Sequence, residues 1–265
     1  MTTIAANLQA VRDRIERAAQ AAGRPGSEIA LIAVSKTFPA EKIAEACAAG
    51  QRAFGESYLQ EAVEKITSLS DISIEWRVAH APQENDHARS DAPRPSAGVV
   101  SPEGPLLRPL EWHFIGPIQS NKTRAIAEHF QWVHSIEREK IAVRLNEARP
   151  ADLPPLNVCI QVNVSGEGSK SGVAPGAELA LARAVIALPR LRLRGLMAIP
   201  EPTTDIQLQR RRFALLREIR DKLGAAGIAL DTLSMGMSDD FEAAIAEGAT
   251  MVLVGSAIFW QRIKD

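Results

Sequence analysis

A lysine ends an apolar, β-branched run, the stretch IALIAVSKTFP from Ile29 to Pro39. Such a run is typical of a strand that is covered on both faces. A charged lysine is rarely buried without a partner, so Lys36 either emerges where the strand ends or has a buried partner. Because desolvation lowers the pKa of an amine and makes it nucleophilic toward a carbonyl carbon, imine chemistry is one hypothesis for Lys36. The alternative is a surface lysine at a strand end.

Glycine and serine occur in two later stretches that could hold a phosphate group. In SMGMSDD, Gly236 permits close backbone approach, and Ser238 could cap a helix that begins at Asp239. Gly255 and Ser256 follow an apolar run near the end of the chain. Helix N-termini present N–H groups to anions, so these loops could grip the phosphate of an aldehyde that reacts with a lysine. Plain helix capping is the alternative.

Alternating strand and helix patterns must position these residues. An amphipathic helix comes first, with Ile4, Leu8, Val11 and Ile15 at helical spacing. Seven strand patterns follow the one that ends at Lys36: RAFGES, EWHFIG, QWVHSI, LNVCIQVNV, LRLRGLMAIP, DTLSMG and TMVLVGSAIF. Eight such units predict a single α/β domain, a (β/α)8 TIM barrel with an extra N-terminal helix, whose chemistry collects at the carboxyl ends of the strands. A doubly wound open sheet is the alternative.

Composition limits the classes of partner. The 265 residues are 46% hydrophobic with a formal net charge of −1, so neither nucleic acid nor an anionic membrane is required. No secretory signal or membrane-spanning run occurs, and the two cysteines, Cys47 and Cys159, fit a reducing compartment. We therefore expect a cytoplasmic protein. His113 and His134 are too scattered for a metal site and are expected to be satisfied core histidines, so no metal is predicted.

One segment interrupts the alternation. Residues 77–111 contain six of the sixteen prolines and little apolar periodicity. We expect a single domain over residues 1–265 with a flexible Pro-rich insert at about 77–111. A lid over the site is the alternative.

The chain resembles the pyridoxal phosphate homeostasis protein family (the YggS/PROSC-like proteins), whose fold is similar to the barrel domain of alanine racemase. The resemblance rests on motifs that span nearly everything outside the insert: AVSKTFP, FGESYLQEA, WHFIGPIQSNKTR, VHSIEREKIA, QVNVSGEGSKSG, RGLMAIPEP, LSMGMSDDFEAAIAEGATMV and GSAIF. It implies that Lys36 holds pyridoxal 5′-phosphate as an imine (a Schiff base). The cofactor-binding set that it implies is Lys36, Ser57, Met235, Gly236, Ser238, Gly255 and Ser256.

The resemblance also implies a role in vitamin B6 cofactor homeostasis without an established catalytic reaction, so no catalytic residue is assigned. Apo-enzymes that receive the cofactor are the expected protein partners, and we expect a monomer. A pyridoxal-dependent racemase and an imine-forming aldolase are the alternatives. Two-base racemization needs a second proton-transfer group on the opposite face, which the racemase fold takes from a tyrosine on an additional domain. The only tyrosine here, Tyr58, follows the second strand.

Three positions depart from the family pattern. Ser57 stands where the family usually has Asn, and it offers a shorter side chain with a single hydroxyl. Leu253 replaces an Arg that faces the pyridine nitrogen and cannot donate a hydrogen bond. Trp260 replaces a Gly. We expect the ring end of the cofactor to be held differently here, while Lys36 and the phosphate loops are retained.

Overall fold

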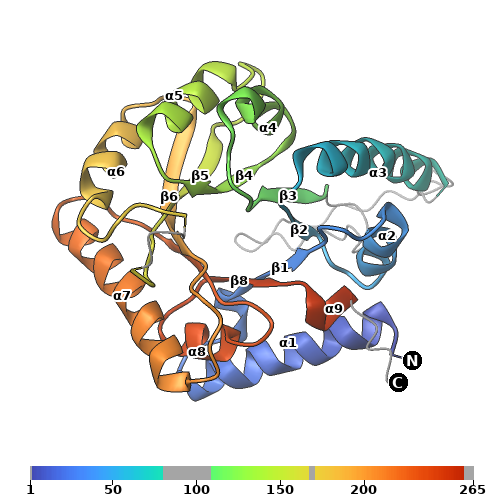
Figure 1. Cartoon of the computed structure of the whole chain (residues 1–265). Helices are drawn as coiled ribbons and strands as arrows, with labels where there is room; N and C mark the ends of the chain where they lie inside the picture. The colour runs from blue at the N-terminus through green and yellow to red at the C-terminus, as the bar shows by residue number, and fades with distance from the viewer. Residues whose placement is uncertain (1, 80–108, 167–170, 260–265) are drawn as a thin grey trace, which may run out of the picture.

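Eight parallel strands close into a barrel in the computed structural model, which describes residues 2–79, 109–166 and 171–259 (Figure 1). Each strand pairs with its neighbour in the chain, and the eighth pairs with the first, with Ala30 opposite Met251. This closure confirms the predicted barrel and excludes the open sheet. The strands are β1 Ala30–Val34, β2 Ala53–Glu56, β3 Glu111–Phe114, β4 Trp132–Ile136, β5 Leu156–Gln161, β6 Leu191–Ala198, β7 Thr232–Met235 and β8 Met251–Val254.

Helices surround the barrel on its outer face. They are α1 Ile4–Ala21, α2 Ala40–Ala48, α3 Leu59–Ala79, α4 Thr123–His129, α5 Glu139–Ala148, α6 Glu178–Ile186, α7 Ile206–Ala225, α8 Phe241–Ala246 and α9 Ser256–Phe259, with 3-10 turns η1 Gly26–Glu28 and η2 Ser120–Lys122. The expected N-terminal helix is α1, and the Thr3 hydroxyl caps it by accepting from the Ala6 N–H. Figure 1 shows α1 running past α8 and α9. Among the described residues, none of the helices combines the length and apolarity of a membrane span.

The structure corrects two predictions near the C-terminus. The expected strand TMVLVGSAIF ends at Val254, and residues from Ser256 form α9, because the N–H groups of Ile258 and Phe259 donate to the Gly255 carbonyl. Short apolar runs do not distinguish a strand from a last helical turn. Similarly, α8 begins at Phe241 rather than Asp239, and Ser238 makes no cap to it.

The Pro-rich insert lies mostly outside the described residues. At its edges, α3 continues to Ala79 and β3 begins at Glu111, so the undescribed segment is 80–108. The Ser165–Gly172 loop is also described only in part.

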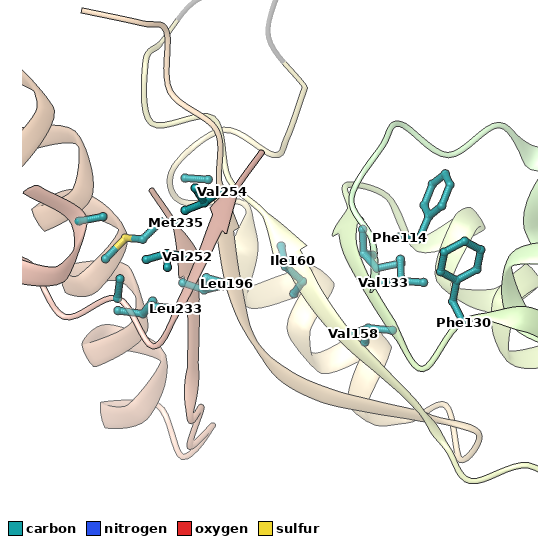
Figure 2. Close-up of a cluster of buried hydrophobic side chains, with 14 of the residues drawn as sticks. Phe114, Phe130, Val133, Val158, Ile160, Leu196, Leu233, Met235, Val252 and Val254 are labelled. Carbon is teal, nitrogen blue, oxygen red and sulfur yellow. The ribbon is translucent and has the colours of Figure 1, made fainter. Parts of the chain in front are cut away.

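Alternation along the strands separates two apolar clusters. One face packs against the helices, and Figure 2 shows part of it, including Leu233 and Met235 of β7 and Val252 and Val254 of β8. The opposite face points into the barrel, where Leu253 packs in a smaller cluster with Ile32, Val34, Ile115, Trp132, Cys159 and Met197. This period of two decides which residues can reach the barrel mouth.

Candidate cofactor site

The predicted binding residues lie at the carboxyl ends of four consecutive strands. Lys36 follows β1 and Ser57 follows β2, while Gly236 to Ser238 follow β7 and Gly255 and Ser256 follow β8. In the barrel these strands are neighbours in the order β7, β8, β1, β2. The sequence-predicted set therefore gathers on one arc of the mouth, the face on which active sites occur in this fold.

Lys36 lies in a tight turn directly after β1. The Phe38 N–H donates to the Ser35 carbonyl at 3.1 Å, and Thr37 has a φ of 68°, a left-handed value that is uncommon for a non-glycine residue. The Lys36 side chain is exposed, and it continues the alternation of Ile32 and Val34, which point into the barrel. The lysine thus emerges at the strand end, above the barrel interior.

A second lysine, which sequence reasoning did not single out, is buried beside this turn. Lys65 of α3 is 5% exposed, and its Nζ donates to the Ser35 carbonyl at 2.8 Å and to Glu56 Oε1 at 2.9 Å. It also donates to Glu61, one helical turn earlier. Burial raises the pKa of Glu56, against the hydrogen bonds from Lys65 and Ser35 that lower it. The i, i+4 spacing of Glu61 and Lys65 was the available sequence signal.

The two phosphate-loop candidates are joined by hydrogen bonds. The Ser238 hydroxyl accepts from the Ala257 N–H in the first turn of α9 at 3.4 Å. Below it, the Leu253 N–H donates to the Gly236 carbonyl at 2.8 Å. Ser238 therefore belongs to the start of α9 rather than to α8, and it lies beside Ser256, whose side chain is exposed.

Gly236 is required by space as well as by conformation. Its φ is 97°, and a Cβ there would lie 2.7 Å from the Ala244 Cβ and 2.8 Å from the Phe241 Cα. The β7 loop can reach the barrel mouth only because α8 packs directly against a residue without a side chain. The close contact at Gly236 is therefore with α8, and the approach of its backbone to a phosphate stays a prediction.

The side chains of Met235 and Ser57 differ in burial at the barrel mouth. The Met235 side chain is fully buried in the cluster between sheet and helices, so only its backbone faces the site. Ser57 is half-buried, and a Cβ at Gly116 would lie 2.5 Å from its carbonyl oxygen, which places the end of β3 against it.

A row of polar side chains crosses the barrel interior. His113 Nε2 bonds Glu111 Oε1 at 2.8 Å, His113 Nδ1 bonds His134 Nε2 at 2.9 Å, and His134 Nδ1 bonds Ser234 Oγ at 2.7 Å. Burial lowers the pKa of both histidines, and for His134 the neighbouring His113 adds to the effect. Both are satisfied core histidines, as predicted. No group of potential metal ligands occurs among the described residues.

The donor set at the mouth fits the chemistry of pyridoxal phosphate. An aldehyde needs an accessible amine, and Lys36 is exposed. A phosphate needs hydroxyl and N–H donors, and Ser238, Ser256 and the first turn of α9 supply them on the adjacent strand ends. The ring would lie over the inner cluster, where Leu253 is 3% exposed and offers no donor.

Comparison with known proteins shows which family the chain is similar to. The family model of the alanine racemase N-terminal domain matches residues 6–262. The pyridoxal phosphate homeostasis protein of Pseudomonas aeruginosa is 56% identical over 99% of this chain and 97% of that protein. Its namesake in Escherichia coli is 49% identical over 99% and 98%. The structure of PipY from Synechococcus elongatus with PLP bound has a TM-score of 0.70 and 32% identity, covering 93% of this chain and 100% of that chain.

Proposed function

The chain belongs to the pyridoxal phosphate homeostasis protein family, and from this membership we propose that it binds pyridoxal 5′-phosphate at the barrel mouth and keeps it available to the cell. Pyridoxal phosphate, when bound, supplies a reactive aldehyde and an electron-withdrawing ring. The relatives reported above are named for homeostasis or for PLP binding and not for a catalysed reaction. The proposed role is therefore binding and supply.

In this proposal Lys36 holds the aldehyde as an imine. Lys36 would supply the amine for this attachment, and the bound cofactor would supply the aldehyde carbon. Ser238, Gly255 and Ser256 hold the phosphate, with Gly236 and the Met235 backbone shaping the loop and Ser57 bordering the opposite side. The observation that carries the proposal is the 3.4 Å hydrogen bond from the Ala257 N–H to the Ser238 hydroxyl, because it joins the loop after β7 to the loop after β8, and β8 pairs with the strand that ends at Lys36.

The position of Tyr58 favours binding over racemization. Tyr58 is 55% exposed and follows β2, on the same rim as Lys36. A two-base racemase needs its second group on the opposite face of the bound amino acid.

The proposal also covers the domain organisation, oligomeric state, location and partners of the protein. We propose a single domain with an insert at about 77–111, acting as a monomer in the cytoplasm and delivering the cofactor to apo-enzymes. Support for a monomer comes from the exposed large apolar side chains of the described residues, which are scattered: Tyr58, Leu153, Ile186 and Ile206. The free cysteines Cys47 and Cys159 suit a reducing compartment. Light scattering after size exclusion tests the oligomeric state.

A titration followed by absorption spectroscopy tests the binding proposal. Adding pyridoxal phosphate to the purified protein should produce a visible absorption band that saturates at one cofactor per chain. Lys36→Ala should remove the band, and Lys42→Ala should retain it, because Lys42 is paired with Glu45 on the surface of α2. An unchanged band in Lys36→Ala would contradict the assignment.

A further inference from the structure

The charged side chains beside the Lys36 turn form hydrogen bonds to the residues on either side of Lys36. Glu56 Oε1 accepts from the Ser35 hydroxyl at 2.7 Å, and Lys65 Nζ donates to the Ser35 carbonyl. On the other side of Lys36, the Thr37 N–H donates to Glu61 Oε1 at 2.7 Å. We call Glu56, Glu61 and Lys65 the acidic clamp. Its bonds therefore end on the residue before Lys36 and on the residue after it.

Burying the charges of the clamp carries a desolvation cost. Glu56 is fully buried and the Lys65 side chain is 6% exposed, so two charges have been removed from water. Buried ion pairs seldom stabilise more than apolar residues of the same volume would. Glu56 Oε2 has no hydrogen-bond partner among the residues that the structure describes, so the pairing of Glu56 is incomplete. This argues that the clamp specifies a backbone geometry rather than adding stability.

The backbone geometry that the clamp specifies is the left-handed conformation of Thr37. Residues other than glycine visit this region at a cost and persist there only when the surroundings fix them. Here the Thr37 N–H points at a carboxylate, which the buried Lys65 holds in place. At the far end of the turn, Phe38 stacks on Phe259 of α9 with ring centroids 5.2 Å apart. The turn is thus anchored to the clamp at one end and to the phosphate-side helix at the other.

We propose that Glu61 and Lys65 are positioning residues that set the direction in which Lys36 leaves the barrel mouth. The proposal rests on the proposed cofactor site and adds to it a role for side chains that do not touch the cofactor. Loss of the clamp would let Thr37 relax and move the Lys36 amine relative to the phosphate loops. Attachment to Lys36 should then slow, while binding through the phosphate should be retained.

Two ligands separate these effects. Pyridoxal phosphate reports attachment, measured as the rate at which Lys36 becomes trapped by borohydride and counted by peptide mass. The analogue 4-deoxypyridoxine 5′-phosphate lacks the aldehyde and reports phosphate and ring binding alone. The circular dichroism of the visible band, per bound cofactor, reports its orientation. Thermal melting of each protein without cofactor reports the fold.

The main variant is Glu61→Ala, because the Glu61 side chain is 33% exposed and its removal leaves the Lys65–Glu56 pair. We expect attachment to slow by about tenfold to a hundredfold, the range for a small misplacement of a reacting group. The dichroic band should change, and analogue affinity should stay within about twofold. Glu61→Gln keeps an oxygen for the Thr37 N–H and should restore most of the rate.

The matched control is Glu45→Ala, which removes an acidic residue from an exposed i, i+3 pair with Lys42 on α2. It should behave as wild type. Lys65→Met should slow attachment further if it folds, and Lys65→Arg should recover part of the rate. Wild-type attachment in Glu61→Ala, or an equal loss of attachment and analogue binding, would overturn the positioning role. If wild type itself carried no cofactor on Lys36, the proposed function would fail instead.

Discussion

Acidification should destabilise this protein through the two histidines buried in the barrel. His113 and His134 have no exposed surface, and burial lowers the pKa of both below the ordinary value of 6.5. In the unfolded chain they titrate normally, so below pH 6.5 the unfolded state binds more protons than the native state. The histidine contribution to stability is therefore complete above pH 6.5 and is lost as the pH falls.

The magnitude follows from proton linkage. Between about pH 7.5 and about pH 5.5, each histidine that stays neutral in the native state lowers the free energy of unfolding by roughly 1.4 kcal/mol. The pKa of His134 is lowered further than that of His113. Together the two histidines should lower the free energy of unfolding by about 1 to 3 kcal/mol over this interval. Glu56 and Asp240 oppose this trend, because burial raises the pKa of each and protonation then favours the native state. The histidine contribution must therefore be isolated by substitution.

Urea unfolding of wild type and His134→Gln at both pH values isolates it. The variant should be less stable at pH 7.5, and its loss of stability on acidification should be smaller than that of wild type by about 1 kcal/mol. Ser234→Ala is the matched control, because it breaks the 2.7 Å bond to His134 without removing a titratable group. It should be destabilised yet keep the wild-type pH dependence. Equal pH dependence in His134→Gln and wild type would refute the reasoning.

Three further predictions concern the barrel mouth and its surroundings. Gly236→Ala should lower the free energy of unfolding by about 1 to 3 kcal/mol more than Gly227→Ala. Both glycines have a positive φ, but of the two only Gly236 lies against other atoms. Equal losses of stability in urea unfolding would contradict this. Replacing residues 80–108 by a short Gly-Ser linker should preserve folding and cofactor binding. The replacement stops before Glu111, because Glu111 bonds His113. A large fall in melting temperature would instead support a packed lid. Leu253→Arg should shift the visible band of bound cofactor without creating alanine racemization, whereas steady racemization by wild type, abolished in Lys36→Ala, would overturn the non-enzyme account.

The sequence alone predicted the barrel because its evidence is local. Each strand shows as a short apolar run and each helix as a 3.6-residue period, and eight alternations leave few topologies. The position of Lys36 followed from the same evidence, because the strand run stops at Ser35 and the exposed lysine comes next. Gly236 could be singled out because glycine after a strand often permits close approach.

Other features depend on contacts between distant residues. The α9 turn forms where the Ile258 and Phe259 N–H groups bond the Gly255 carbonyl, a local pairing that a short apolar run does not reveal. Pairing of Lys65 with Glu56 requires that α3 fold back onto the end of β2. The direction of Met235 depends on register, since a shift of one residue would turn its side chain into the barrel. These properties arise only when the barrel closes.

Borohydride reduction of the cofactor-loaded protein, followed by peptide mass analysis, tests the central claim most directly. Reduction converts an imine into a stable secondary amine, so the modified lysine can be located in a digest. The account predicts one modified site, at Lys36, with Lys36→Ala left unmodified. Finding the reduced cofactor on Lys122 or Lys170 while Lys36 remained free would contradict it.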